Sequence, residues 1–387
     1  MRASCLVVFA ACGGKDASSP PDASRIDGAP DAPVGCARQP AAANRVRQVV
    51  VSHPYDSAGN PAPTFEVLEL DGTGALTRPD RTFELGRTVV SSIVFTADGK
   101  VGVVPTENGK LGVFAVDDAG MPSVIDAGFA GSFYASRVVI DGDRVFVLDG
   151  NTRDNGGGIY LITLDCDGKP TDHGLIAAAK LPGGMAFTAG HAVIAAADFL
   201  DSAAGEDVHL ATFDPATRTQ SADAFADDMQ IVGGTALSVD GKTFLIGDTS
   251  QFGSAPNRVA IVTVQGNNLM PAGTVDVEDP EAIVTSPFGN VAVVASAFGD
   301  ALFVLDDGGT AGAWRVRGEV TYQGAAPMLP GDLAMIERGD LRGRVLVSEN
   351  VSVRQLQFRA DGSVEDLGSL AFGSGLQNIG GAIGVTP

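Results

Sequence analysis

The chain contains few residues of the kinds that form catalytic or metal centres. Its four histidines are His53, His173, His191 and His209, and the predicted strands and turns do not bring three of them together as zinc ligands. The sequence contains no G-x-S-x-G nucleophile motif and no H-E-x-x-H metal motif. We therefore predict no metal site and no cofactor, and the catalytic residues, if there are any, stay unknown at this stage.

Three further motifs have ordinary structural interpretations. Gly241-Lys242-Thr243 matches the end of a phosphate-binding loop, but Ala236 stands where the first glycine of that loop belongs, so we predict a β-turn. Residues 149–155 are rich in oxygen ligands, yet Arg153 interrupts the calcium-loop pattern, and a polar turn fits better. Arg338-Gly339-Asp340 falls in a predicted hairpin turn, where Gly-Asp is common.

The overall charge limits the classes of partner. Among 387 residues, 47 are Asp or Glu and 26 are Lys or Arg, which gives a formal net charge of −21. Such a surface repels nucleic-acid phosphates and anionic lipid headgroups. We therefore expect no nucleic-acid partner, and membrane attachment would need an anchor.

The N-terminus suggests such an anchor. Met1-Arg2 precedes an apolar run over residues 3–11, and Ala10 and Ala11 stand directly before Cys12. This pattern resembles a bacterial lipoprotein signal, which implies cleavage after residue 11 and acylation (palmitate among the chains) of Cys12. The resemblance further implies a location in the bacterial cell envelope, as an outer-membrane lipoprotein or as a periplasmic or extracellular protein. No later segment has the roughly 20 apolar residues that a membrane-spanning helix needs.

Composition divides the chain into three parts. Residues 1–11 form the predicted signal, residues 12–43 a disordered spacer rich in Pro, Asp, Ala and Gly, and residues 44–387 the folded body. Once the signal is removed and Cys12 is acylated, Cys36 and Cys166 are left over. In an oxidising compartment these two are candidates for a disulfide that joins the spacer to the body.

The folded body repeats one turn type. Gly-containing turns between two apolar strands recur about every 40–55 residues, which is the length of a four-stranded propeller blade. They centre on Gly99, Gly142, Gly190, Gly241, Gly289 and Gly343. The first two strands of each unit are apolar almost throughout, which indicates strands covered on both faces by neighbouring blades.

Counting the units gives a closed ring. Three strands precede the first full unit, and one apolar strand, residues 381–386, follows the last, so we predict a seven-bladed β-propeller closed by pairing of the C-terminal strand with the N-terminal strands. The turn motif S/T-x-D/P-G before an apolar run occurs in residues 95–104 and 237–246, and residues 285–294 carry the related turn Ser-Pro-Phe-Gly before an apolar run. On this motif the sequence resembles the seven-bladed YVTN-repeat and lactonase-like propellers. We expect a monomer.

The propeller prediction leads to two hypotheses of function. The first is a cell-envelope binding or scaffold protein, whose unidentified protein, glycan or small-molecule ligand lies on the face that carries the long loops. The second, implied by the resemblance, is a lactonase-like hydrolase with Arg, His and carboxylate at the inner strand ends. The inner ends include Ser136-Arg137 but no histidine, so we prefer binding. The candidate ligand face comprises Tyr134, Asp227, Asp228, Gln230, Asp279, Glu281 and Gln377.

Overall fold

The structure, a computed structural model, describes most of the chain after the predicted spacer. The described residues are 36, 38–88, 92–150, 157–188, 191–197, 208–212, 220–225, 229, 231–249, 257–266, 268–310, 312–373, 376–378 and 381–387, with only the backbone for 209–212 and 220–225. Four predicted site residues lie outside this set, namely Cys12, Asp227, Asp228 and Gln230, as does most of the oxygen-rich segment 149–155.

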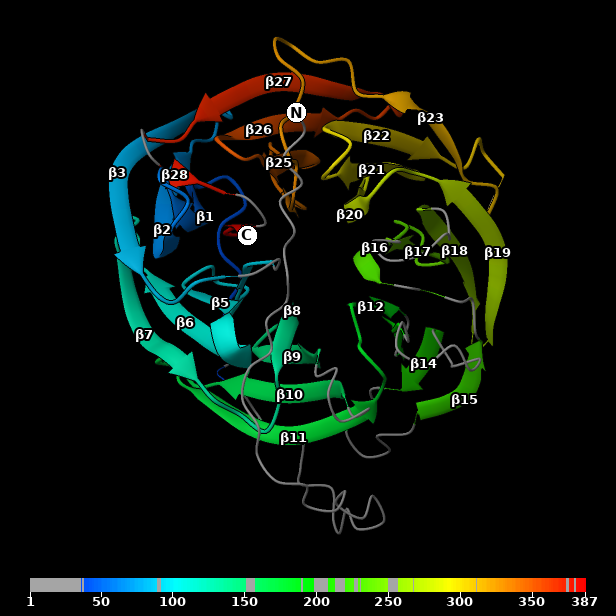
Figure 1. Cartoon of the computed structure of the whole chain (residues 1–387), viewed down its shortest axis with the longest axis horizontal. Helices are drawn as coiled ribbons and strands as arrows, with labels where there is room; N and C mark the ends of the chain where they lie inside the picture. The colour runs from blue at the N-terminus through cyan, green and yellow to red at the C-terminus, as the bar shows by residue number, and fades with distance from the viewer. Residues whose placement is uncertain are drawn as a thin grey trace.

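The described chain is all β, with a single short 3-10 turn, η1 (Glu107–Gly109). Its strands form small antiparallel sheets arranged around a common axis as a β-propeller (Figure 1). Within the described part, no helix has the length and apolarity needed to cross a membrane.

Six sheets consist of four consecutive strands each. The first three are β4 (Val94–Phe95), β5 (Val101–Thr106), β6 (Lys110–Val116) and β7 (Pro122–Phe129); β8 (Ala135–Asp141), β9 (Arg144–Asp149), β10 (Gly158–Leu164) and β11 (Pro170–Ala178); and β12 (Gly184–Thr188), β13 (His191–Ala195), β14 (Val208–Thr212) and β15 (Gln220–Phe225).

The other three regular sheets follow in the same order. They are β16 (Val232–Leu237), β17 (Thr243–Asp248), β18 (Arg258–Gln265) and β19 (Asn268–Asp276); β20 (Pro280–Thr285), β21 (Val291–Ser296), β22 (Ala301–Asp306) and β23 (Arg315–Glu319); and β24 (Leu333–Met335), β25 (Arg344–Ser348), β26 (Ser352–Phe358) and β27 (Val364–Ala371).

The two ends of the chain share one further sheet of mixed origin. It contains β1 (Arg47–Asp56), β2 (Pro61–Leu70), β3 (Leu76–Glu84), β28 (Leu376–Gln377) and β29 (Ile383–Val385). Val51 pairs with Ile383 and Val49 with Val385, while Tyr55 pairs with Gln377. The regular four-stranded blades therefore number six, not the predicted seven, because the terminal sheet has five strands and its C-terminal edge is divided between two short segments.

The recurring turn motif has a simple hydrogen-bonding basis. In the turn between β4 and β5, the Thr96 hydroxyl donates to Asp98 Oδ1 at 2.6 Å, and the amide of Lys100 donates to the same oxygen at 3.0 Å. Ser238 and Asp240 repeat this arrangement between β16 and β17. The left-handed residue of such a turn is glycine, as at Gly99 with φ of +70°, because other side chains rarely adopt that conformation. The motif therefore predicts hairpin turns, and the turn predicted at Gly241 is confirmed.

The core lies between neighbouring sheets rather than inside any one of them. Every residue of β5 and of β21 is buried, which confirms that second strands are covered on both faces. Between the terminal sheet and the next one, aromatic rings form a continuous cluster, with Phe65 against Phe83 at 5.2 Å and Phe83 against Phe114 at 5.0 Å between ring centroids. This packing joins the outer strands of the two neighbouring sheets.

Candidate functional site

A group of charged residues lies at one end of the propeller axis. Each four-stranded sheet begins with its inner strand, and neighbouring strands are antiparallel, so every inner strand starts at the end that also carries the connections between sheets (Figure 1). Four charged residues lie at or just before such starts. They are Arg137 in β8, Asp279 and Glu281 around the start of β20, and Asp332 before β24, and we call them the axial site.

Arg137 crosses from one inner strand to another. Its Nη1 donates a hydrogen bond to the carbonyl oxygen of Gly233 in β16, which belongs to the second sheet along from β8. The hydrogen bond therefore joins two inner strands that are separated in the ring by β12. From this position the positive charge of Arg137 lowers the pKa values of both Glu281 and Asp332, partly offsetting the effect of their burial.

Asp332 is a carboxylate with a strongly raised pKa. Burial raises its pKa to about 7, although hydrogen bonds from the amides of Ile383 and Leu333, the charge of Arg137 and the hydroxyl of Ser92 all favour the ionised form. Oδ1 accepts from Leu333 N at 2.9 Å and from Ser92 Oγ at 3.2 Å, and Oδ2 accepts from Ile383 N at 3.0 Å. Protein atoms surround the side chain, yet it retains contact with solvent. At neutral pH this group is therefore present in both protonation states.

Asp279 and Glu281 add two further carboxylates at the same end. Burial raises the pKa of Glu281, and the neighbouring Asp279 adds to that rise, while Arg137 opposes it. Burial, with Glu278 nearby, also raises the pKa of Asp279. Asp279 has a φ of +43°, a left-handed conformation that is uncommon outside glycine and is often kept at functional positions.

Glycine makes the close approach of the inner strands possible. A Cβ atom on Gly234 of β16 would lie 2.4 Å from the Cα of Ala282 in β20, a distance that packed atoms do not adopt. Because this contact is with backbone, a side chain at residue 234 would force the two inner strands apart. The glycine therefore brings Glu281 and the Arg137 acceptor, Gly233, to neighbouring positions.

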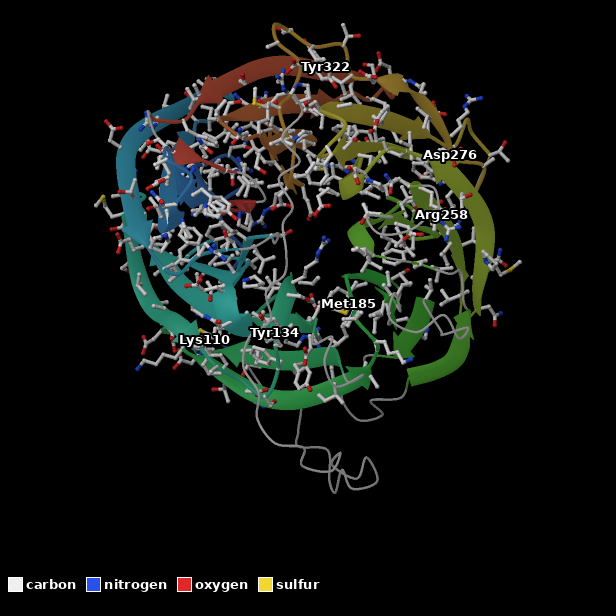
Figure 2. The ribbon with its side chains drawn as sticks, viewed as in Figure 1. Lys110, Tyr134, Met185, Arg258, Asp276 and Tyr322 are labelled. Carbon is white, nitrogen blue, oxygen red and sulfur yellow. A yellow bond between two sulfur atoms is a disulfide. The ribbon has the colours of Figure 1, made fainter. Side chains whose placement is uncertain are left out.

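The predicted ligand face is at this end of the axis. Tyr134 directly precedes β8, is 49% exposed, and packs on Gly109 of η1. Gln377 lies on β28, where it is half-buried and pairs with Tyr55 of β1. In Figure 2, Tyr134 and Met185 lie nearer the axis than Asp276 and Tyr322, which lie at the rim. The structure thus places Tyr134, Asp279, Glu281 and Gln377 at one end, whereas Asp227, Asp228 and Gln230 are outside the described residues.

His53 and His173 contact residues outside the axial site. His53 is fully buried in β1, with Nε2 3.3 Å from Glu66 Oε2 and its ring edge on Phe372. His173 lies on β11, with Nε2 2.7 Å from the hydroxyl of Thr163. Across the described residues, no group of three or more His, Cys, Asp or Glu side chains is arranged to hold a metal ion.

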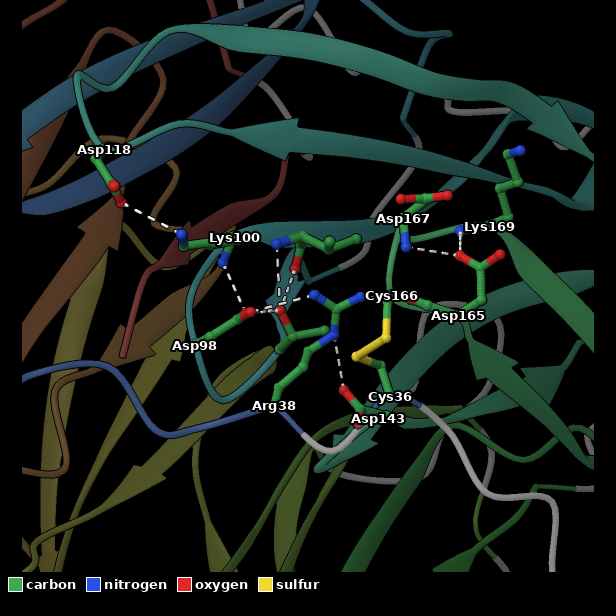
Figure 3. Close-up of polar contacts among 12 residues, drawn as sticks. Cys36, Arg38, Asp98, Lys100, Asp118, Asp143, Asp165, Cys166, Asp167 and Lys169 are labelled. Atoms are coloured by element: carbon green, nitrogen blue, oxygen red, sulfur yellow. Dashed lines mark hydrogen bonds and ion pairs between the residues drawn. A yellow bond between two sulfur atoms is a disulfide. The ribbon is translucent and has the colours of Figure 1, made fainter.

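The opposite end of the propeller holds the start of the folded chain. Cys36 and Cys166 are joined by a disulfide, with their Cα atoms 4.8 Å apart (Figure 3). Arg38 lies between the turns of two sheets, 3.1 Å from Asp98 and 2.9 Å from Asp143 (Figure 3). The spacer was predicted to extend to residue 43, but these contacts attach the chain to the propeller from Cys36 onward.

The Arg338-Gly339-Asp340 turn contributes to the same contact. The side chain of Arg338 donates to the carbonyl of Ala97 at 3.2 Å, and the amide of Asp340 donates to Asn44 Oδ1 at 2.9 Å. The tripeptide thus binds the chain's own N-terminal segment. Residues 38–46 therefore connect turns of several sheets on this end, opposite the axial site.

Asp332 was not predicted as a site residue. Arg137 was expected at an inner strand end, but Asp332 is separated from it by almost two hundred residues in the sequence. The sequence does contain a signal for Asp332. This residue directly precedes the inner strand β24, just as Asp279 directly precedes the inner strand β20 of the sheet before it. Aligning the repeats by their inner strands would have found it.

Comparisons with known proteins support the fold. No protein-family profile matches the chain, and no curated protein sequence does. The periplasmic gluconolactonase of Pseudomonas aeruginosa is similar in structure, with a TM-score of 0.62 and 16% identity over 85% of this chain and 98% of that one. A putative 6-phosphogluconolactonase from Bacteroides fragilis is similar at TM-score 0.63 and 13% identity, over 90% and 100% of the two chains.

A third solved structure shows that the fold alone does not define an activity. The hypothetical selenium-binding protein from Sulfolobus tokodaii has a TM-score of 0.62 and 11% identity, over 87% of this chain and 93% of its own. At such identities the likeness establishes a shared propeller fold. The predicted resemblance to lactonase-like propellers is confirmed at that level.

Proposed function

We propose that the protein is a lactonase-like hydrolase whose reaction takes place at the axial site. The observation that carries this proposal is a carboxylic acid with a pKa of about 7, Asp332, within electrostatic range of the guanidinium of Arg137. A general base works best when its pKa lies near the working pH, and a fixed cation stabilises the oxyanion that forms when water attacks a carbonyl. The structural similarity to gluconolactonase-type propellers agrees with this chemistry.

The reaction needs only groups that the chain supplies. Ionised Asp332 takes a proton from water as the water oxygen bonds to the lactone carbonyl carbon, and Arg137 stabilises the charge that develops on the carbonyl oxygen. The ring C–O bond then breaks, and the leaving oxygen takes the proton from Asp332, which gives a hydroxy acid. In the described contacts Oδ2 accepts one hydrogen bond, from Ile383, so this oxygen has capacity for a water molecule.

Hydrolysis of a lactone panel tests the proposal. We expect the purified chain to accelerate ring opening of δ-lactones, and Asp332→Asn to lower kcat/KM by about a hundredfold or more, since general-base catalysis contributes on that order. The asparagine of this variant keeps the shape of the side chain and one accepting oxygen. An unchanged melting temperature would show that the lower kcat/KM comes from lost catalysis and not from lost stability. Asp118→Asn is the matched control, because Asp118 is 82% exposed on a turn beyond β6. A rate equal to the uncatalysed rate for every lactone would contradict the proposal.

A binding protein without catalysis is the second candidate. Its support is that Asp332 already accepts three hydrogen bonds from its own chain and that none of the described inner strands carries a histidine. In that case the same end of the propeller would bind a protein, glycan or small molecule as a scaffold. Saturable binding of a ligand together with an uncatalysed lactone rate would favour this function.

The cellular setting and the ring closure are also proposals. The Cys36–Cys166 disulfide suits an oxidising compartment, which supports export to the cell envelope, and Cys12 is the proposed lipid attachment site. Incorporation of labelled fatty acid that is lost in Cys12→Ala would test that site. We further propose that the five-stranded terminal sheet is a seventh blade that closes the ring, supported by the pairing of β1 with β28 and β29.

A further inference from the structure

Three large apolar side chains stand exposed on loops at the same end of the propeller as the axial site. Phe298, in the turn between β21 and β22, has 58% of its surface exposed; Met328, between β23 and β24, has 50%; and Val351, between β25 and β26, has 45%. Apolar side chains of this size usually occur singly on a surface, whereas neighbouring ones often mark a binding region. We call these three residues the apolar rim.

Hydrogen bonds join the loops of the apolar rim to one another. The amide of Leu329 donates to Asp300 Oδ1 at 2.7 Å, which ties the Met328 loop to the Phe298 turn. The amide of Asn350 donates to the carbonyl of Met328 at 2.9 Å, which ties the Val351 turn to the same loop. The three loops that carry these side chains are therefore joined to one another by hydrogen bonds.

The same connections lead inward to the axial site. The amide of Asn378 donates to the carbonyl of Asn350 at 2.8 Å, and the amide of Gly331, next to Asp332, donates to the carbonyl of Ser348 at 3.0 Å. Asp332 in turn accepts the amide of Ile383. The loops of the apolar rim are thus linked by hydrogen bonds to the segment that carries Asp332.

The charge of the axial site limits what such a ligand can carry. Two carboxylates, those of Glu281 and Asp332, lie within electrostatic range of Arg137, whose Nη1 already donates to Gly233. A third, that of Asp279, lies within electrostatic range of Glu281. A phosphorylated lactone would bring two negative charges towards these carboxylates. Like charges in a partly desolvated site repel strongly, so an uncharged ligand is favoured.

We propose that the ligand of the axial site is an uncharged lactone with an apolar alkyl or aryl substituent, which packs on the apolar rim formed by Phe298, Met328 and Val351. This inference rests on the function proposed for the axial site and names its substrate class. It distinguishes the ligand from the polar and phosphorylated sugar lactones named for the similar structures.

Binding of lactams tests the ligand class independently of catalysis, because the amide ring resists hydrolysis. The probes are δ-valerolactam, its 6-pentyl derivative, and a derivative that carries a phosphate ester at the same carbon, each titrated into the full chain by calorimetry. We expect the pentyl compound to bind about tenfold tighter than δ-valerolactam, since transfer of several methylenes onto an apolar surface supplies that difference. The phosphate compound should bind about tenfold more weakly or not at all.

Matched variants locate the substituent. Phe298→Asn with Val351→Ser should remove the preference for the pentyl compound. Phe288→Asn with Val239→Ser should retain it, because Phe288 (39% exposed) and Val239 (49% exposed) lie in hairpin turns at the opposite end of the propeller. All three proteins should melt at similar temperatures, since none of the changed side chains belongs to the buried core.

The outcomes separate this inference from the proposed hydrolase. If lactams show the expected preference but no lactone is hydrolysed, the ligand class stands and the catalytic proposal fails. If lactones are hydrolysed but the pentyl and unsubstituted lactams bind equally, or neither lactam binds, the inference is overturned. Self-association that is lost in the Phe298→Asn variant, without any effect on lactam binding, would also overturn it, because a second copy of the chain would then be the occupant.

Discussion

The disulfide between Cys36 and Cys166 should contribute much of the stability of the propeller. The two residues are separated by 130 positions, and the closed loop contains the strands from β1 to β10. On the chain-entropy estimate, closing a loop of this length restricts the unfolded chain by about 17 cal/mol/K, or about 5 kcal/mol at 25 °C. Reduction of the bond should lower the free energy of unfolding by up to this amount.

The expected change in melting temperature follows from the size of the fold. Unfolding entropy of about 2.1 cal/mol/K per residue, over the roughly 350 residues from Cys36 onward, gives about 0.7 kcal/mol/K, so 5 kcal/mol corresponds to about 7 °C. The ion pairs of Arg38 with Asp98 and Asp143 do not depend on the bond and should survive its reduction. Differential scanning calorimetry at one scan rate, with and without dithiothreitol, measures the shift.

The double variant Cys36→Ser/Cys166→Ser provides the control. It should melt at the temperature of the reduced wild type and should not respond to dithiothreitol. A thiol assay on the unfolded wild type should find no free thiol from these two residues before reduction. A wild type that contains the bond yet melts at the same temperature after reduction would refute the entropy argument.

Three further predictions follow from the structure. Arg354→Met should lower the free energy of unfolding by about 3–5 kcal/mol, measured by urea titration, because it leaves Glu349 and Asp366 buried without their partner. The control Arg359→Met, which removes an exposed ion pair, should lower it by less than about 1 kcal/mol. The pKa of Asp332 in the folded protein, about 7, is higher than that of an unfolded aspartate. Its contribution to the free energy of unfolding should therefore fall as the pH rises from about 4 to 7, and Asp332→Asn should remove this pH dependence. Deletion of residues 380–387 removes β29 from β1, so the truncated chain should aggregate during purification; a soluble product that melts like the full chain would exclude a closing role for this strand.

The propeller could be predicted from the sequence because its information is local. A turn such as Thr96-Ala-Asp98-Gly99 specifies its own hydrogen bonds, and it recurs before a buried strand in sheet after sheet. The terminal sheet was harder to predict, because the set of strands that it contains depends on how β28 and β29, far along the chain, pair with β1. The predicted closing strand, residues 381–386, is observed as β29 (Ile383–Val385), with the separate short strand β28 before it.

The axial site was predictable only in part. Asp279, Glu281, Tyr134 and Gln377 were expected at the end with the long loops, because inner strands start there in any propeller. The partnership of Arg137 with Asp332 depends on the angle between two sheets across the axis, which no short segment of sequence encodes. The perturbed pKa of Asp332 likewise comes from its burial by residues of several sheets.

The pH dependence of lactone hydrolysis tests the central claim most directly. With the preferred lactone, kcat/KM of the wild type should rise with pH through an inflection near 7, as Asp332 loses its proton and becomes a base. Asp332→Asn should abolish this inflection and lower the plateau, while Asp118→Asn leaves both unchanged. An inflection near 7 that persists in Asp332→Asn would contradict the assignment of Asp332 as the general base.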